Sequence, residues 1–153
     1  MEIVHVESAA QLEEVRRLFQ EYWDSFGFTP CFQNFGDELA GLPGVYARPD
    51  GRLALATVEG AVAGCAALRR FDTARCEAKR LYVRPAFRGS GAGRALLDWL
   101  IAEARAAGYC ELLGDTMPVM QQALAMYERM GFERTGPYGK NPTEGAIYIR
   151  LVL

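Results

Sequence analysis

The chain has 153 residues, 50% of them hydrophobic and 24% charged, which is the size and composition of one globular domain with a single core. Its 17 Lys and Arg against 19 Asp and Glu give a net charge of −2, which leaves no basic excess to neutralise a nucleic-acid backbone. The longest stretch free of charge is far shorter than the ~20 residues of a membrane-spanning helix. The first residues lack the basic and apolar pattern of a signal peptide.

The cysteine pattern argues against a metal site. Cys31, Cys65, Cys76 and Cys110 contain no CxxC pair, and His5 is the single histidine. Zinc sites need about four Cys or His ligands at short spacings, so no metal is expected. Most of the cysteines lie in apolar, strand-like stretches, including Cys110, where a free thiol acts as a small buried hydrophobic group. Free thiols fit a reducing compartment, and the cytoplasm is the expected location.

The first predicted elements are a short strand over residues 1–6 and an amphipathic helix. Ser8, followed by Gln11 three residues later, matches the capping box that begins a helix. Apolar residues then recur at helical spacing, and Gly27 is expected to end the helix. The next segment, 28–44, is broken by glycine and proline and contains three phenylalanines. It forms either a wall of a binding pocket or a loop that its phenylalanines hold on the core.

Three strands joined by short turns are predicted next, over residues 53–59, 61–71 and 75–83, and short turns imply antiparallel neighbours. The remaining pattern predicts a long helix, a short strand, a second helix and two final strands. Their expected bounds are 91–107, 109–113, 118–131, 132–135 and 146–153. This order predicts one α+β domain over residues 1–153, with a mixed sheet and helices on its faces.

Three glycines stand at alternate positions where the last of these three strands runs into the long helix. Gly89, Gly91 and Gly93 let the backbone approach a ligand closely, and the helix N-terminus adds partial positive charge. The arginines around this turn are Arg84, Arg88 and Arg94. The segment is therefore a candidate phosphate-binding loop, and the alternative is a tight strand–helix turn that needs glycine for its geometry alone.

The spacing of these glycines excludes two common nucleotide-binding loops. A Walker A loop requires lysine directly after its last glycine, and no lysine follows a glycine in this segment. A dinucleotide fingerprint requires a third glycine three residues after the second, but Arg94 and Leu96 occupy the two positions that this spacing allows. The phosphate is therefore expected to belong to another class of ligand.

Two segments resemble the Gcn5-related N-acetyltransferase (GNAT) family. The run Arg88-Gly-Ser-Gly-Ala-Gly93 is similar to the family's Arg/Gln-x-x-Gly-x-Gly/Ala signature, whose loop binds the pyrophosphate of acetyl-CoA. The run from Ala123 through Tyr127 to Gly131 and Phe132 is similar to the family's Ala-x-x-x-Tyr-x-x-x-Gly-Phe pattern. With the order of elements, the resemblance covers nearly the whole chain. It implies the acyl-CoA N-acyltransferase fold, with a mostly antiparallel sheet splayed between strands four and five, and acetyl-CoA as co-substrate.

The resemblance also implies roles for individual residues. The strand end at Leu81, Tyr82 and Val83 would pair with the pantetheine arm, and the Leu81 N–H would donate to the thioester carbonyl. The amides that would hold the pyrophosphate are those of Arg88, Gly89, Ser90, Gly91, Ala92, Gly93 and Arg94. Tyr127 matches the residue that protonates the departing thiolate of CoA. The alternative for Tyr127 is an aromatic side chain that packs inward from its helix.

The acceptor amine must lose a proton during the reaction, so a base is needed. Glu77 lies four residues before Leu81, and strand alternation predicts that both side chains share one face of the sheet. The family often has a carboxylate base at this place, which makes Glu77 the candidate base. The alternative is a structural ion pair of Glu77 with Lys79 or Arg75.

Met120 departs from the family pattern, which commonly has an asparagine at this position to contact the pantetheine. Water, the backbone or another polar side chain is therefore expected to replace that contact. Asp115 and Thr116, at the end of the preceding predicted strand, are the candidates to supply it.

The resemblance predicts an enzyme that transfers the acetyl group of acetyl-CoA directly to a primary amine of a small molecule or peptide. The alternatives are a non-catalytic acyl-CoA-binding or sensing module and a protein-interaction domain with incidental glycines. Segments 28–44 and 136–145 would form the acceptor pocket through Phe32, Tyr138 and Asn141. Acetyl-CoA and a small amine are the expected partners, with neither nucleic acid nor a membrane, and the sequence is compatible with a homodimer.

Overall fold

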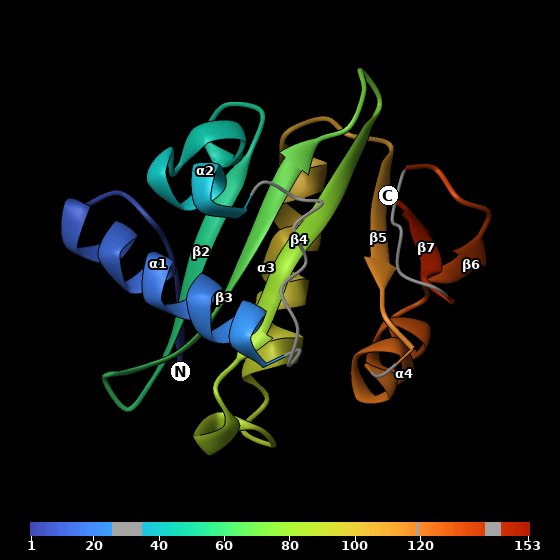
Figure 1. The fold of residues 1–153 in the computed structure, drawn as a ribbon. Coiled ribbons are helices and arrows are strands. Elements are labelled where there is room, and N and C mark those ends of the chain that lie inside the picture. Colours follow the sequence, from blue (N-terminus) through green and yellow to red (C-terminus); the bar gives the residue numbers. More distant parts are fainter. Residues whose placement is uncertain (26–34, 119, 140–144) are drawn as a thin grey trace.

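The computed structural model describes residues 1–25, 35–118, 120–139 and 145–153. In these ranges seven strands form one sheet in the order β1-β2-β3-β4-β5-β7-β6 (Figure 1). The strands are β1 (Glu2–His5), β2 (Arg52–Val58), β3 (Ala61–Arg70), β4 (Arg75–Val83), β5 (Glu111–Thr116), β6 (Glu133–Thr135) and β7 (Ile147–Val152). The helices are α1 (Ala9–Asp24), α2 (Phe35–Ala40), α3 (Ala92–Ala106) and α4 (Gln121–Arg129).

Neighbouring strands pair in antiparallel fashion except at one place, between β4 and β5. These two strands pair in parallel over three positions only, from Arg75 opposite Glu111 to Glu77 opposite Leu113. Beyond this point they separate, while β5 stays paired with β7 as far as Thr116. The predicted splay between strands four and five is therefore confirmed, and the second half of β4 has no partner on its β5 side.

Two apolar clusters cover the opposite faces of the sheet. One cluster contains Leu96, Leu97 and Leu100 of α3, packed on residues of β2, β3 and β4. The other contains Leu18 and Phe19 of α1. In Figure 1, α1 and α2 lie in front of the sheet and α3 lies behind it. The prediction of an α+β fold with helices on both faces is confirmed.

The start of α1 agrees closely with the prediction. Ser8 accepts a hydrogen bond from the backbone N–H of Gln11, and the Gln11 side chain accepts one from the N–H of Ser8, which is the predicted capping box. The last helical residue that the structure shows is Asp24, and the predicted end at Gly27 lies outside the described residues.

The bounds predicted for the strand after α3 are wrong, because β5 begins two residues later and extends to Thr116. Tyr109 completes the end of α3 instead: its N–H donates to the carbonyl of Ala104 and its ring packs with the α3 cluster. The prediction that Cys110 is buried is also wrong, since this residue is exposed in the turn before β5. Helix α4 begins at Gln121 rather than at Pro118.

None of the helices in the described ranges is both long and apolar enough to span a bilayer. The same ranges contain no group of three or more His, Cys, Asp or Glu side chains placed to hold a metal ion. Cys65 and Cys76 are buried free thiols, as predicted, and Cys31 lies outside the described residues.

Candidate active site

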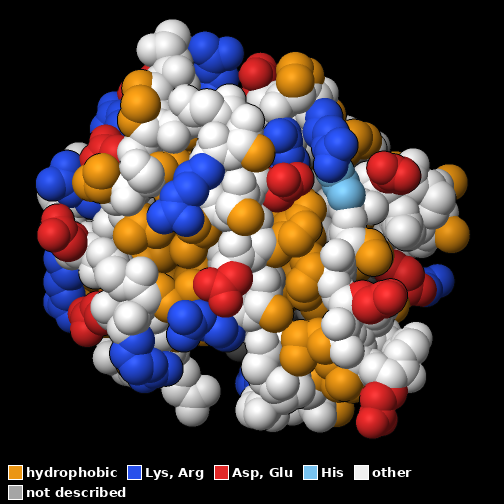
Figure 2. Space-filling view, turned by 180° about the vertical axis from the view of Figure 1, so that it is seen from behind, with side chains coloured by type: hydrophobic (Ala, Val, Ile, Leu, Met, Phe, Trp, Pro, Cys, Tyr) orange, Lys and Arg blue, Asp and Glu red, His pale blue; other side chains and the backbone are white. Residues whose placement is uncertain are grey.

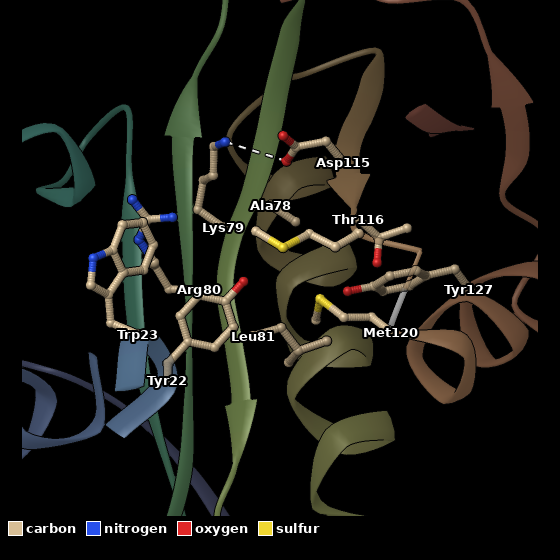
Figure 3. Close-up of a pocket in the computed structure, with 11 residues that line it drawn as sticks. Tyr22, Trp23, Ala78, Lys79, Arg80, Leu81, Asp115, Thr116, Met120 and Tyr127 are labelled. Carbon is tan, nitrogen blue, oxygen red and sulfur yellow. Dashed lines mark hydrogen bonds and ion pairs between the residues drawn. The ribbon is translucent and has the colours of Figure 1, made fainter. Parts of the chain in front are cut away.

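A pocket opens where β4 and β5 separate (Figure 3). Its walls come from four elements that are distant in the sequence. They are Tyr22 and Trp23 at the end of α1, residues 78–81 of β4, residues 115–117 at the end of β5, and Met120 with Tyr127 at α4. Because the strands diverge there, their backbone and side chains face the opening instead of each other.

β4 carries a bulge at the edge of this pocket. Two of its residues, Arg80 and Leu81, lie opposite one residue of β3, Ala66. Arg80 has a φ of 58°, in the left-handed region that non-glycine residues rarely adopt. The backbone of Arg80 and Leu81 is therefore outside the β3 register, and it lies beyond the last β5 pair as well.

The bulge corrects one prediction about faces. Ala78 and Leu81 both pack with the α3 cluster, although they are three residues apart. Glu77, next to Ala78, therefore faces the α1 side of the sheet. The predicted shared face of Glu77 and Leu81 is wrong, because the extra residue reverses the alternation of the strand between them.

Tyr127 reaches the pocket from α4, and Figure 3 shows its hydroxyl pointing into the opening. Its ring contacts Phe132, with centroids 5.5 Å apart, at the start of the chain that follows α4. Burial, with smaller contributions from Tyr22 and Asp115, raises the pKa of Tyr127 above that of an ordinary tyrosine. The phenol thus keeps its proton at physiological pH, which a proton donor to a thiolate requires.

The region around Met120 contains an unsatisfied polar group. Met120 lines the pocket at the N-cap of α4, in the place predicted from the sequence. Thr116, also in the wall, is 3% exposed, and its hydroxyl oxygen has no hydrogen-bond partner. A buried hydroxyl without a partner is rare and costly, so a ligand group in this pocket would find a ready hydrogen-bonding partner in Thr116.

Glu77 is 2% exposed, and its carboxylate is held from three sides. Arg69 Nε donates to Oε1 at 2.9 Å, and the Tyr138 hydroxyl donates to Oε2 at 2.9 Å. Lys79 Nζ lies 3.3 Å from Oε2, so the ion pair weighed as the alternative for Glu77 is present. Glu77 is not among the pocket-lining residues, and its role as base stays a prediction.

Lys79 links this carboxylate to the pocket. Its Nζ also lies 3.3 Å from Oδ1 of Asp115, which lines the opening (Figure 3). Glu77, Lys79 and Asp115 thus form a chain of ion pairs, which we call the acidic row, from the buried Glu77 on β4 to Asp115 in the pocket wall. The candidate polar residues Asp115 and Thr116 both face the opening, as the sequence suggested.

The predicted phosphate loop leads from β4 into α3. Gly91 is the N-cap of α3 with a φ of 91°, and Gly89 has a φ of 85°. No side chain caps the helix at Gly91, and the Ser90 hydroxyl accepts only from the N–H of Ala92, at 3.3 Å. The first N–H groups of a helix lack intrahelical partners and carry partial positive charge. The loop has the geometry of an anion site, and its role stays a prediction.

The arginines near the loop differ in their availability. Arg84 is turned toward α1, where its guanidinium donates to Glu21 at 2.8 Å. Arg88 and Arg94 are exposed on the loop side, and Arg94 Nε lies 3.3 Å from Asp98. Arg88 and Arg94 are thus the arginines that can reach an anion at the loop.

The loop lies beside the end of β4 and α4. A side chain added at Gly93 would lie 3.6 Å from Val83 at the end of β4 and 4.0 Å from Met126 of α4. The space-filling view of the face behind Figure 1 is hollowed at its lower edge, with Lys and Arg side chains beside the hollow (Figure 2). An elongated ligand with an anionic end fits this arrangement of loop and pocket.

Several pocket residues were not predicted from the sequence. Tyr22 and Trp23 belong to the apolar residues that recur at helical spacing in α1, and their position at the end of this helix is the sequence signal that they border an opening. Tyr138, predicted in the acceptor pocket, donates to Glu77 and its ring contacts Phe71 and Tyr148. Phe32 and Asn141 lie outside the described residues.

Comparison with known proteins identifies the class. The model of the acetyltransferase (GNAT) family matches residues 12–132. An uncharacterized N-acetyltransferase of Schizosaccharomyces pombe is 38% identical over 142 residues, covering 92% of this chain and 87% of the relative. An IAA acetyltransferase of Azospirillum brasilense is 41% identical over 95 residues, covering 61% of each chain.

Solved structures show the same fold. An acetyltransferase from Streptococcus agalactiae superposes with a TM-score of 0.83 at 20% identity, covering 99% of this chain and 98% of the other. An acetyltransferase from Salmonella typhimurium, solved with acetyl-CoA, has a TM-score of 0.75 at 20% identity and covers 99% and 93%. The chain belongs to the acetyltransferase (GNAT) family. The predicted enzyme class, an acetyl-CoA-dependent N-acetyltransferase, is confirmed by this membership.

Proposed function

We propose that the protein transfers the acetyl group of acetyl-CoA directly to a primary amine of a small molecule or peptide. The observation that carries the proposal is the convergence of Tyr127, the bulged backbone at Leu81 and the Asp115 carboxylate on one pocket. The loop at residues 88–94 lies beside the end of β4 and Met126 of α4, and it would hold the pyrophosphate. Direct transfer needs all three kinds of group in one place.

The roles follow from the chemistry of the groups. The amine nitrogen attacks the thioester carbonyl carbon, and the Leu81 N–H donates to the carbonyl oxygen as negative charge develops there. When the carbon–sulfur bond breaks, Tyr127 gives its proton to the thiolate. The proton lost by the amine goes to the acidic row, in which Glu77 is the proposed base. Asp115, which lines the pocket, would take the proton from the amine; Lys79 would then give one of its own ammonium protons to Glu77 and accept the proton held by Asp115.

Two features support the binding of acetyl-CoA at this site. The Thr116 hydroxyl has no hydrogen-bond partner, and no side chain caps the start of α3, so both could bond to the co-substrate. Leu81, Tyr82 and Val83 would pair with the pantetheine amides because this end of β4 has no strand partner on its β5 side. We also propose a cytoplasmic location, since the described cysteines are free thiols.

One observation favours the alternative of a non-catalytic acyl-CoA-binding or sensing module. The Glu77 carboxylate has hydrogen-bond partners on both oxygens and lies outside the pocket wall, which is the arrangement of a structural group. A module of this kind would bind acetyl-CoA and release no thiol.

The test is a turnover screen with acetyl-CoA and separate amine classes: amino acids, polyamines, aminoglycosides and peptide N-termini. Free thiol and the acetylated product are both measured. We expect turnover with at least one class, and a kcat lowered by about 10²–10⁴-fold in Glu77→Gln. Acetyl-CoA binding with no product from any class would instead support the sensing module.

Two further variants separate the members of the acidic row. Asp115→Asn is expected to lower kcat as Glu77→Gln does, because both interrupt one proton path. Glu111→Gln, a matched change of a half-buried, ion-paired carboxylate on the same strand, should leave kcat unchanged. A normal kcat in Glu77→Gln with loss in Asp115→Asn would make Asp115 the base.

A further inference from the structure

Arg80 occupies a backbone conformation that its own residue type disfavours. The first residue of a bulge with positive φ is usually glycine, whereas Arg80 is held at 58°. A left-handed conformation is unfavourable for a non-glycine residue, and such residues persist only where their surroundings hold them. The contacts of the Arg80 side chain identify what holds this one.

The guanidinium of Arg80 is fixed by a carboxylate from α2. Nε donates to Oε2 of Glu38 at 2.9 Å and Nη2 donates to Oε1 at 3.0 Å, a two-point contact that sets the orientation of the planar group. Both side chains are largely buried, with 5% of Arg80 and 18% of Glu38 exposed. The Tyr46 hydroxyl also donates a hydrogen bond to Oε1 of Glu38, at 2.9 Å.

Two more contacts immobilise this ion pair. The guanidinium carbon lies 5.0 Å from the centroid of the Trp23 ring, in a cation–π contact, and Trp23 stacks on Phe35 of α2. The carbonyl of Arg80 accepts from the Cys65 thiol at 3.4 Å. The strained residue is thus held at its side chain by α1 and α2 and at its backbone by β3.

The bulge determines how the next residue meets the pocket. It takes Arg80 and Leu81 out of the β3 register and sends the Leu81 side chain to the α3 face. Leu81 is one of the residues that line the opening between β4 and β5. A buried ion pair is a weak source of stability but a good source of a defined conformation. Since burying the two charges costs desolvation free energy, we look for a role of this ion pair other than stabilising the fold.

We propose that Glu38, acting through Arg80, is a positioning residue for acetyl transfer, because their ion pair maintains the left-handed bulge that presents the Leu81 N–H to the thioester. This inference rests on the role proposed above for Leu81. It assigns to α2, which contributes no residue to the pocket wall among the described positions, a part in the rate of the chemical step.

The test uses the tolerance of glycine for positive φ. Removing one partner alone would leave a buried charge, so both are changed together. In Glu38→Gln/Arg80→Ala, alanine resists the left-handed conformation and the bulge is lost. In Glu38→Gln/Arg80→Gly the ion pair is equally absent, but glycine can keep the bulge without it.

We expect the alanine double variant to lose about 10–100-fold in kcat with a little-changed acetyl-CoA KM, since a donor displaced by ~1 Å costs about this much. The glycine double variant is expected to recover most of the lost kcat. Glu103→Gln, which breaks the Arg52–Glu103 ion pair remote from the pocket, serves as the control and should lower only Tm. Equal kcat values in the two folded double variants would overturn the proposal.

A second readout separates this inference from the proposed function. The backbone amide signal of Leu81 in a nitrogen-15 NMR spectrum is followed while acetyl-CoA is added to each protein. A shift in the wild type and the glycine variant, with none in the alanine variant, supports the positioning role even if no amine is acetylated. The same shift in all three proteins would overturn it, whereas missing turnover alone would count against the proposed function.

Discussion

Tyr127 combines a half-buried ring with a hydroxyl in the pocket, and burial raises its pKa above the ordinary value of 10.0. Tyr127→Phe removes the proton donor and keeps the ring contact with Phe132. We expect kcat to fall by about 10²–10⁴-fold with little change in acetyl-CoA KM, because the proton is needed only as the carbon–sulfur bond breaks. Steady-state kinetics check this result.

The pH dependence gives a control for that experiment. Because the folded pKa of Tyr127 is raised, the donor form is complete below the ordinary tyrosine pKa and is lost only at still higher pH. No alkaline decline of kcat from this group is expected up to pH 10. A wild-type kcat in Tyr127→Phe would contradict the donor role.

The Thr116 hydroxyl has no hydrogen-bond partner, so removing it should affect the stability of the free protein and the binding of acetyl-CoA in opposite directions. Thr116→Val keeps the shape and removes a buried polar group that lacks a partner, so Tm without ligand should stay level or rise. If the hydroxyl bonds to the pantetheine, acetyl-CoA KM should rise about two- to tenfold, the worth of one neutral hydrogen bond.

Thr57→Val in β2, away from the pocket, is the matched change for Thr116→Val and should leave KM unaltered. Thermal melts and initial rates are measured on both. A lower Tm with an unchanged KM in Thr116→Val would assign the hydroxyl to structure.

At the scale of elements, two glycines at opposite ends of α3 have nearly the same backbone. Gly91 has a φ of 91° and Gly108 has a φ of 90°, and a side chain would meet little or nothing within 4 Å at either position. Valine at either place therefore carries a similar strain, on the order of 1–2 kcal/mol. Only Gly91 belongs to the predicted phosphate loop.

Gly91→Val is expected to raise acetyl-CoA KM by at least tenfold, since a branched side chain blocks the approach of a pyrophosphate to the backbone. Gly108→Val should lower Tm by a similar amount and leave KM unchanged. Equal KM values in the two variants, measured with one acceptor amine, would remove the loop from the binding site.

Sequence patterns predicted the elements well where local chemistry decides them. The capping box at Ser8 and the glycine turns around α3 are examples, because a few neighbouring residues determine each of them. Tyr127 and Met120, whose spacing belongs to the second motif, both line the pocket. These features need no knowledge of distant contacts.

The bulge in β4 could not be predicted in this way. Its left-handed residue is an arginine, and the reason it holds that conformation is a carboxylate 42 positions earlier in the chain. One extra residue then moved Glu77 to the face opposite to the one that alternation predicts for it. The same limit applies to Tyr22 and Trp23, whose role depends on where β4 and β5 diverge.

At the scale of the whole molecule, we expect His5 to make the stability of the fold depend on pH. It lies in β1, where Nδ1 bonds to the Leu53 carbonyl at 3.0 Å and Nε2 is buried without a partner. Burial, followed by the charge of Arg48, lowers the pKa of His5 below 6.5. The folded state thus prefers the neutral ring, and protonation favours unfolding.

The sign gives a defined pH window. The contribution of His5 is complete above its unfolded pKa of about 6.5 and is lost as pH falls through the lower folded value. Tm should therefore decrease as the pH falls below about 6.5 in the wild type, and His5→Gln should flatten this part of the curve. Parallel curves for the two proteins would show that other groups cause the decrease.

The short parallel pairing of β4 with β5 has a consequence for the mechanics of the fold. Three residue pairs join the two halves of the sheet, and an acyl-CoA lying in the opening would touch both halves. Ligand binding adds about 2.7 kcal/mol of stability at a hundredfold excess over Kd. Because the ligand would contact both halves of the sheet, we expect it to stabilise the region where β4 and β5 pair. Amide exchange in β5 and β7 would then slow on binding more than exchange in β2 and β3. A bound co-substrate would thus connect two halves of the sheet that the described strands join through three residue pairs.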